Sequence, residues 1–132
     1  MIRHPGNISL PDPQGMARQF ALGRVVFAAG FLAAPVAGAR LLGLDTATAR
    51  RVGWLTRMMA VRDGALGVGA AMAADPRPWL LGGAVSDAVD AVVIAGALKQ
   101  GRIKGIVPTL VAPGAALLAA AGAATAVRLR RD

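Results

Sequence analysis

Residues 54–98 read WLTRMMAVRDGALGVGAAMAADPRPWLLGGAVSDAVDAVVIAGAL, which is two apolar stretches joined by the turn sequence DPRP. Each stretch has about the roughly 20 residues that a bilayer-spanning helix needs. The prolines of the junction prevent a single helix from continuing through it. Charged side chains lie at the centres of the two stretches: Arg62, Asp63, Asp87 and Asp90. The segment therefore predicts an antiparallel pair of membrane helices with charged groups at mid-depth.

Two further apolar stretches flank this pair. Asp12-Pro13 is a typical helix start, with Asp at the N-cap and Pro in the first turn, and the helix is expected to run to about Leu42 with a kink at Pro35. Asp45 or Thr46 is expected to cap the next helix, which runs to about Ala74. We therefore predict an all-α integral membrane four-helix bundle. Its parts are a tail over residues 1–19, spans at about 20–39, 54–73, 79–98 and 106–127, and a basic tail over 129–132.

The composition supports this class. The chain has 132 residues, of which 55% are hydrophobic, and its mean hydropathy is +0.54, which is too apolar for a soluble domain of this size. The net charge of +8 suggests nucleic-acid binding, but the Lys and Arg residues flank the apolar stretches and are not interleaved with aromatic residues. The expected partner is the lipid bilayer, and nucleic acid is excluded.

The orientation in the membrane is not decided by charge. With four spans, both termini lie on one side, and seven basic residues fall on each side of the membrane. Residues 1–19 contain no apolar signal segment, which favours cytoplasmic termini in the cell membrane. Dual insertion stays open. Trp54 and Trp79 stand at the expected helix starts, where interfacial Trp is common.

The four central charges are expected to lie at one level, because they are about equally far from the DPRP turn. Asp87 and Asp90 are three residues apart and share a helix face. Arg62 and Asp63 are adjacent and point about 100° apart, so at most one of them aims at the following helix. The other turns toward the first or the last span.

Charge balance makes this group a candidate site. Four unpaired charges at mid-depth would cost roughly 10 kcal/mol, yet Arg62 alone faces three carboxyl groups. One Asp can be protonated, Arg24 or Arg57 can reach inward, or a bound cation can complete the balance; we favour the first. The alternative is that Arg62 and an Asp only fix the register of two helices.

The candidate catalytic residues are thus Asp63, Asp87, Asp90 and Arg62, and the candidate substrate-binding residues are Arg24, Arg57 and Trp54. The chain has no Cys, and its one histidine, His4, lies in the tail. A metal site, a haem site and a Ser-His-Asp triad are therefore unsupported, and no cofactor is expected. The glycines of residues 64–69 are interpreted as helix packing rather than a ligand loop.

Three runs resemble a known group: GRVVFAAGFLAAP (23–35), LTRMMAVRDGALGVG (55–69) and SDAVDAVV (86–93). They are similar to a family of uncharacterised small four-helix membrane proteins of actinobacteria, which is distantly similar to the DoxX-type group. The resemblance covers about residues 18–128 and is most specific at residues 62–67 and at the pair Asp87 and Asp90. It implies a four-helix bundle and little about activity.

Three functions remain open. The first is a midplane Arg/Asp site that binds a lipidic or small hydrophobic molecule, in its sharpest form a metal-free acid/base enzyme for epoxide opening, cyclisation or isomerisation. The second is a proton-coupled small transporter, although the small multidrug-resistance carriers use a membrane-embedded Glu and this chain has none. The third is an accessory or assembly subunit of a larger membrane complex. Small residues along 106–127 suit packing within the bundle or in a homo-oligomer.

Overall fold

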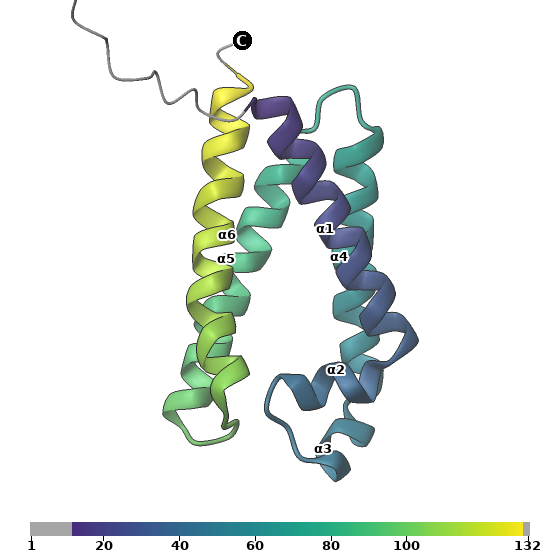
Figure 1. Cartoon of the computed structure of the whole chain (residues 1–132), viewed down its shortest axis with the longest axis vertical. Coiled ribbons are helices and arrows are strands. Elements are labelled where there is room, and N and C mark those ends of the chain that lie inside the picture. Colours follow the sequence, from purple (N-terminus) through teal and green to yellow (C-terminus); the bar gives the residue numbers. More distant parts are fainter. Residues whose placement is uncertain (1–11, 131–132) are drawn as a thin grey trace, which may run out of the picture.

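The computed structural model describes residues 12–130, and every regular element in that range is a helix (Figure 1). Four helices are long and two are short. They are α1 (Pro13–Ala33), α2 (Pro35–Leu41), α3 (Thr46–Arg51), α4 (Gly53–Met72), α5 (Arg77–Lys99) and α6 (Ile106–Arg128).

The predicted caps are confirmed. The Asp12 carboxylate accepts hydrogen bonds from the backbone N–H groups of Gln14 and Gly15, and Pro13 occupies the first turn of α1. The Asp45 carboxylate accepts from the hydroxyl and the backbone N–H of Thr48. These hydrogen bonds stabilise the ionised carboxylate and hold the pKa of Asp45 below its ordinary value.

Two helices that the sequence predicts as continuous are each interrupted in the structure. The first does not kink at Pro35: α1 ends at Ala33, Ala34 leaves the helical conformation, and Pro35 begins α2. A residue before proline is sterically disfavoured in the α region, which accounts for the break. The helix predicted to run from Pro13 to about Leu42 is therefore two helices, Pro13–Ala33 and Pro35–Leu41. The second predicted helix is divided at Val52, which precedes Gly53, a residue of poor helix propensity.

The long helices form two pairs. α1 packs along α4, and α5 packs along α6, while α4 and α5, although consecutive in the chain, share a smaller contact. Small residues bring the helices together. A Cβ built on Gly67 would lie 2.8 Å from the backbone oxygen of Ala21, and one on Gly122 would lie 3.7 Å from that of Leu80. The interpretation of the glycines at 64 and 67 as packing residues agrees with these approaches.

The two pairs are fastened to each other at both ends. Near the chain termini, an apolar cluster joins α1, α5 and α6; it contains Ala17, Leu80 and Ala126, with Phe20 and Leu129 packed against it. At the other end, Gly43 lies against the backbone of Lys104 at the start of α6. Gly43 has φ +88°, and a Cβ there would lie 2.6 Å from the Lys104 oxygen, so only glycine fits without strain.

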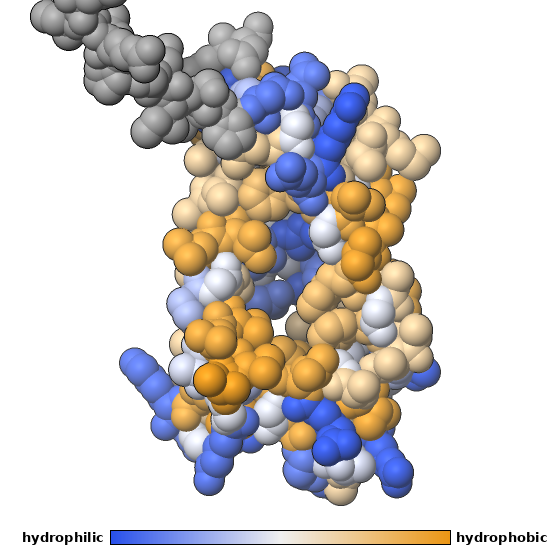
Figure 2. Space-filling model, viewed as in Figure 1, coloured by the Kyte–Doolittle hydropathy of each residue, from blue (hydrophilic) through white to orange (hydrophobic). Residues whose placement is uncertain are grey.

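Three helices, α1, α5 and α6, are long and apolar enough to cross a membrane. α4 has 20 residues but carries Arg57, Arg62 and Asp63. The molecule has hydrophilic surface at its two ends and mainly hydrophobic surface between them (Figure 2). Large apolar side chains are exposed along all four long helices, among them Leu22, Met58, Val92 and Leu117. This distribution is consistent with a membrane protein.

The close approach at Gly67 generates a stability prediction. We expect Gly67→Ala to destabilise the protein by about 1–3 kcal/mol, because the new methyl group overlaps the α1 backbone. Gly23→Ala is the matched control: a Cβ at Gly23 meets no described atom within 4 Å, and alanine favours the helix. Thermal unfolding in detergent measures both. Equal melting temperatures for the two variants would contradict the tight α1–α4 contact.

Candidate functional site: a charged chain between the helix pairs

Five charged side chains form one alternating chain. It runs Asp87–Arg24–Asp63–Arg62–Asp90, and we call it the charged chain. Arg24 donates to Asp87 at 2.5 Å and to Asp63 at 3.0 Å. Arg62 donates to Asp63 at 3.4 Å and to Asp90 at 2.7 Å. Every guanidinium therefore lies between two carboxylates, and a carboxylate stands at each end.

The charged chain crosses from one helix pair to the other. Arg24 lies near the middle of α1, Arg62 and Asp63 near the middle of α4, and Asp87 and Asp90 near the middle of α5. The level alignment predicted from the DPRP turn agrees with these contacts. So does the divergence of the adjacent pair: Arg62 reaches α5, whereas Asp63 turns toward α1.

Arg24 lies deeper along its helix than the apolar residues around it suggested. The span predicted at about 20–39 puts Arg24 near its start, close to a membrane surface. Because α1 begins at Pro13, Arg24 lies in mid-helix and reaches inward, which was one of the three ways of balancing the charges. The cap at Asp12-Pro13 was the signal that could have located Arg24 correctly.

A glycine makes room for this guanidinium. A Cβ built on Gly83 would lie 2.8 Å from Nη2 and 2.9 Å from Nε of Arg24. The absence of a side chain at Gly83 therefore lets Arg24 approach α5 and reach Asp87, which is one helical turn further along.

The charges of the five residues in the charged chain do not cancel. Two guanidinium groups face three carboxyl groups, so one negative charge is in excess when all three are ionised. One end is more exposed than the other: the side chains of Asp87 and Arg24 are 15% and 16% exposed, whereas those of Asp90 and Arg62 are 23% and 37% exposed. The Arg62–Asp90 end is therefore the accessible end.

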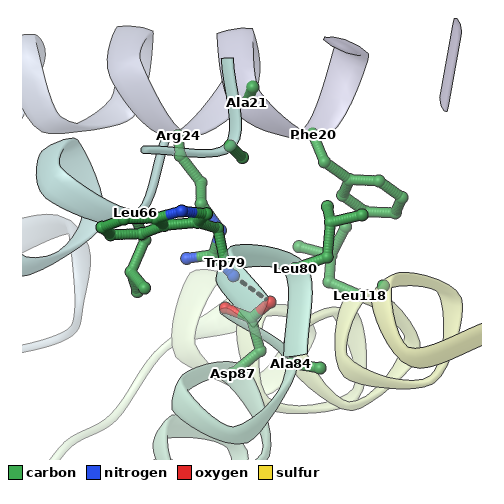
Figure 3. Close-up of a pocket in the computed structure, with 11 residues that line it drawn as sticks. Phe20, Ala21, Arg24, Leu66, Trp79, Leu80, Ala84, Asp87 and Leu118 are labelled. Carbon is green, nitrogen blue, oxygen red and sulfur yellow. Dashed lines mark hydrogen bonds and ion pairs between the residues drawn. The ribbon is translucent and has the colours of Figure 1, made fainter. Parts of the chain in front are cut away.

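The Asp87 end is the more enclosed one. Asp87 and Arg24 form the polar wall of a small cavity (Figure 3), whose other walls include Phe20, Leu66 and Trp79. The cavity holds about 10 Å³, which is about the space of one water molecule. In Figure 3, Arg24 extends from α1 toward Asp87, and the apolar rings and side chains surround the pair.

The Asp90 end has unused hydrogen-bonding capacity. Among the described residues, two buried side-chain atoms have no hydrogen-bond partner, Nε of Arg62 and Oγ of Ser86. Ser86 precedes Asp90 by four residues in α5 and so lies on the same side of that helix. The sequence interpretation gave Ser86 no role, although its spacing from Asp90 was a signal for it.

The structure does not bring the other two candidates to this place. The Trp54 residue is 63% exposed near the start of α4, and Arg57 is exposed on the same helix. No cluster of three potential metal ligands occurs within residues 12–130.

A hollow gives access to the middle of the molecule. Figure 2 shows an opening between the α1/α4 pair and the α5/α6 pair, with hydrophilic surface inside it and hydrophobic surface on both flanks. The charged side chains in the middle parts of α1 and α5 are Arg24, Asp87 and Asp90, and all three belong to the charged chain. The hollow is therefore bounded by apolar helices and leads to the charges.

The chain matches no family model, no curated protein and no solved structure. Any function has to be argued from the residues. Chemically, the accessible end offers a carboxylate, a guanidinium and a hydroxyl, which can bind a polar group or exchange a proton with it.

Because Arg24 contacts two carboxylates, its removal leaves both without their shared partner. We expect Arg24→Leu to cost about 3–5 kcal/mol of stability, the usual effect of removing one partner of a buried ion pair. Arg24→Lys should recover only part of it, since an ammonium lacks the planar fork that reaches both carboxylates. Arg18→Leu, on an exposed position of the same helix, is the control. Similar melting temperatures for Arg24→Leu and Arg18→Leu would contradict the bridging role.

Proposed function

We propose that the chain is a four-span membrane protein and that α4 is the fourth span. What supports this is the pairing of its charges: Arg62 and Asp63 are neutralised within the charged chain. Arg57 is one turn from the start of α4, so its side chain can extend to the membrane surface. An α4 of 20 residues is about 30 Å long, which matches the hydrocarbon core.

Four spans place α3, which contains Ala47, and the turn after α4 on opposite sides of the membrane. The natural chain has no Cys, so a single introduced Cys is a unique label. We expect Ala47→Cys and Ala74→Cys, both at exposed positions, to react with a membrane-impermeant maleimide from opposite sides of sealed vesicles. Gly101→Cys, between α5 and α6, should react from the same side as Ala47→Cys. Labelling of Ala47→Cys and Ala74→Cys from one side would remove α4 as a span.

Within this arrangement, the charged chain is proposed as a midplane binding site for a small, mainly apolar molecule that carries a polar group. The observation that carries the proposal is the accessible end. Arg62 and Asp90 are partly exposed although they are in mid-helix, and the hollow between the helix pairs has hydrophilic surface inside it and hydrophobic surface on its flanks (Figure 2). A pair that served only to fix two helices in register gains nothing from such exposure, whereas a binding site requires it.

Acid/base catalysis is the sharpest form of this proposal. In that form Asp90 accepts or donates the proton, Arg62 orients the polar group of the substrate, and Asp63 and Arg24 hold Arg62 in place. A proton-coupled carrier is the second candidate. The excess carboxylate of the charged chain favours it, because a carrier of this kind needs a group that exchanges a proton for its cargo.

Binding is tested with Asp90→Asn, which keeps the size of the side chain and removes its charge. Asp75→Asn is the matched control, since Asp75 is exposed in the turn and pairs with Arg77. We expect gently purified wild type and Asp75→Asn to retain a small molecule in native mass spectrometry with lipid analysis, and Asp90→Asn to lose most of it. If all three preparations are equally empty, or equally loaded, the binding function is contradicted.

A further inference from the structure

The excess negative charge of the charged chain indicates the charge of the ligand that the site binds. This inference rests on the binding function proposed above. Asp90 is paired with Arg62 of α4, and the rest of the charged chain, which is Asp63, Arg24 and Asp87, continues from that guanidinium. No ionisable residue lies between Val107 and Val127 of α6. Nothing from α6 therefore offsets the excess, and one positive charge is needed to complete the balance.

The two ends of the charged chain are not equivalent as places for that charge. The cavity beside Asp87 has room for about one water molecule, so no organic group fits there. The side chain of Asp90 is 23% exposed, against 15% for that of Asp87, and it lies outside the small cavity that Asp87 lines. A charged ligand of any size therefore has to be held at Asp90.

Ser86 gives this end a second polar group. It is 8% exposed, its Oγ has no described hydrogen-bond partner, and it lies one turn before Asp90 on the same helix. A hydroxyl oxygen and a carboxylate on one face of α5 form a pair of acceptors, which suits a cation. The flanks of the hollow are hydrophobic (Figure 2), so the rest of the ligand is apolar.

We infer that the site at Asp90 and Ser86 binds a lipophilic organic cation with a single positive charge, in exchange for a proton. Without the cation, the proton supplies the missing positive charge. When the cation arrives, that proton leaves to water, and the net charge of the occupied site stays the same. No bond other than that of the exchanged proton is broken or made.

Two probes of nearly equal size and shape and opposite charge test the inference: tetraphenylphosphonium and tetraphenylborate. Binding is measured by equilibrium dialysis to wild type, Asp90→Asn and Asp75→Asn in nanodiscs of zwitterionic lipid, and binding to empty nanodiscs is subtracted. We expect wild type and Asp75→Asn to bind the phosphonium at least about tenfold more tightly than the borate, a difference of about one charge interaction. Asp90→Asn should lose this preference. Calorimetry in two buffers of different ionisation enthalpy should show one proton released for each phosphonium bound.

The outcomes separate this inference from the function on which it rests. Two results would show that the ligand is not a cation while the binding site itself stands: the borate binds as well as the phosphonium, or no phosphonium binds. In either case a co-purified molecule would still be lost in Asp90→Asn. Release of no proton overturns the exchange. If neither probe binds and no co-purified molecule depends on Asp90, both proposals fail. Thermal unfolding of Asp90→Asn in the same nanodiscs shows that any loss occurs in a folded protein.

Discussion

Arg24 holds the molecule together at its centre. Its guanidinium joins Asp63 of α4 to Asp87 of α5, so one side chain of α1 links both helix pairs. A charge at this depth is expensive unless it is paired, and each member of the charged chain is paired because the others are present. The positions of α1, α4 and α5 along one another are thereby coupled, because a shift of one helix by a turn would leave at least one charge without its partner.

The close packing of the helix backbones allows these charged side chains to pair. Glycines at 67 and 83 allow α1 and its guanidinium to approach α4 and α5 closely. The buried residues of the long helices are mostly alanine, glycine, threonine and serine rather than large apolar side chains. In a membrane, apolar burial offers little driving force between helices, so close contact and paired charges have to provide the specificity. The large apolar side chains are left to face outward.

Much of this could be predicted from the sequence, because the strongest signals were local. Asp12-Pro13 and Asp45 marked helix starts, the DPRP turn set the level of Arg62 and Asp63 against Asp87 and Asp90, and a tight turn required an antiparallel neighbour. The sequence did not predict which helix packs against which. Adjacency in the chain suggested that α4 belongs with α5, but its main partner is α1, and only that packing brings Arg24 to Asp63. The break at Ala34 was missed because an uninterrupted apolar pattern outweighed the conformational cost at a single residue. The break at Val52 lies in the polar segment that follows Asp45, where no proline marks it.

The division of the charged chain between the two helix pairs has a consequence for synthesis and insertion. The first pair to leave the ribosome contributes Arg24, Arg62 and Asp63 and carries one positive charge in mid-helix, while the second contributes Asp87 and Asp90 and carries two negative charges. In the four-span arrangement proposed above, neither half would be electrically neutral inside the bilayer, and the two would attract each other through a medium of low dielectric constant. The charges of α1 and α4 would therefore stay unbalanced until α5 is inserted beside them.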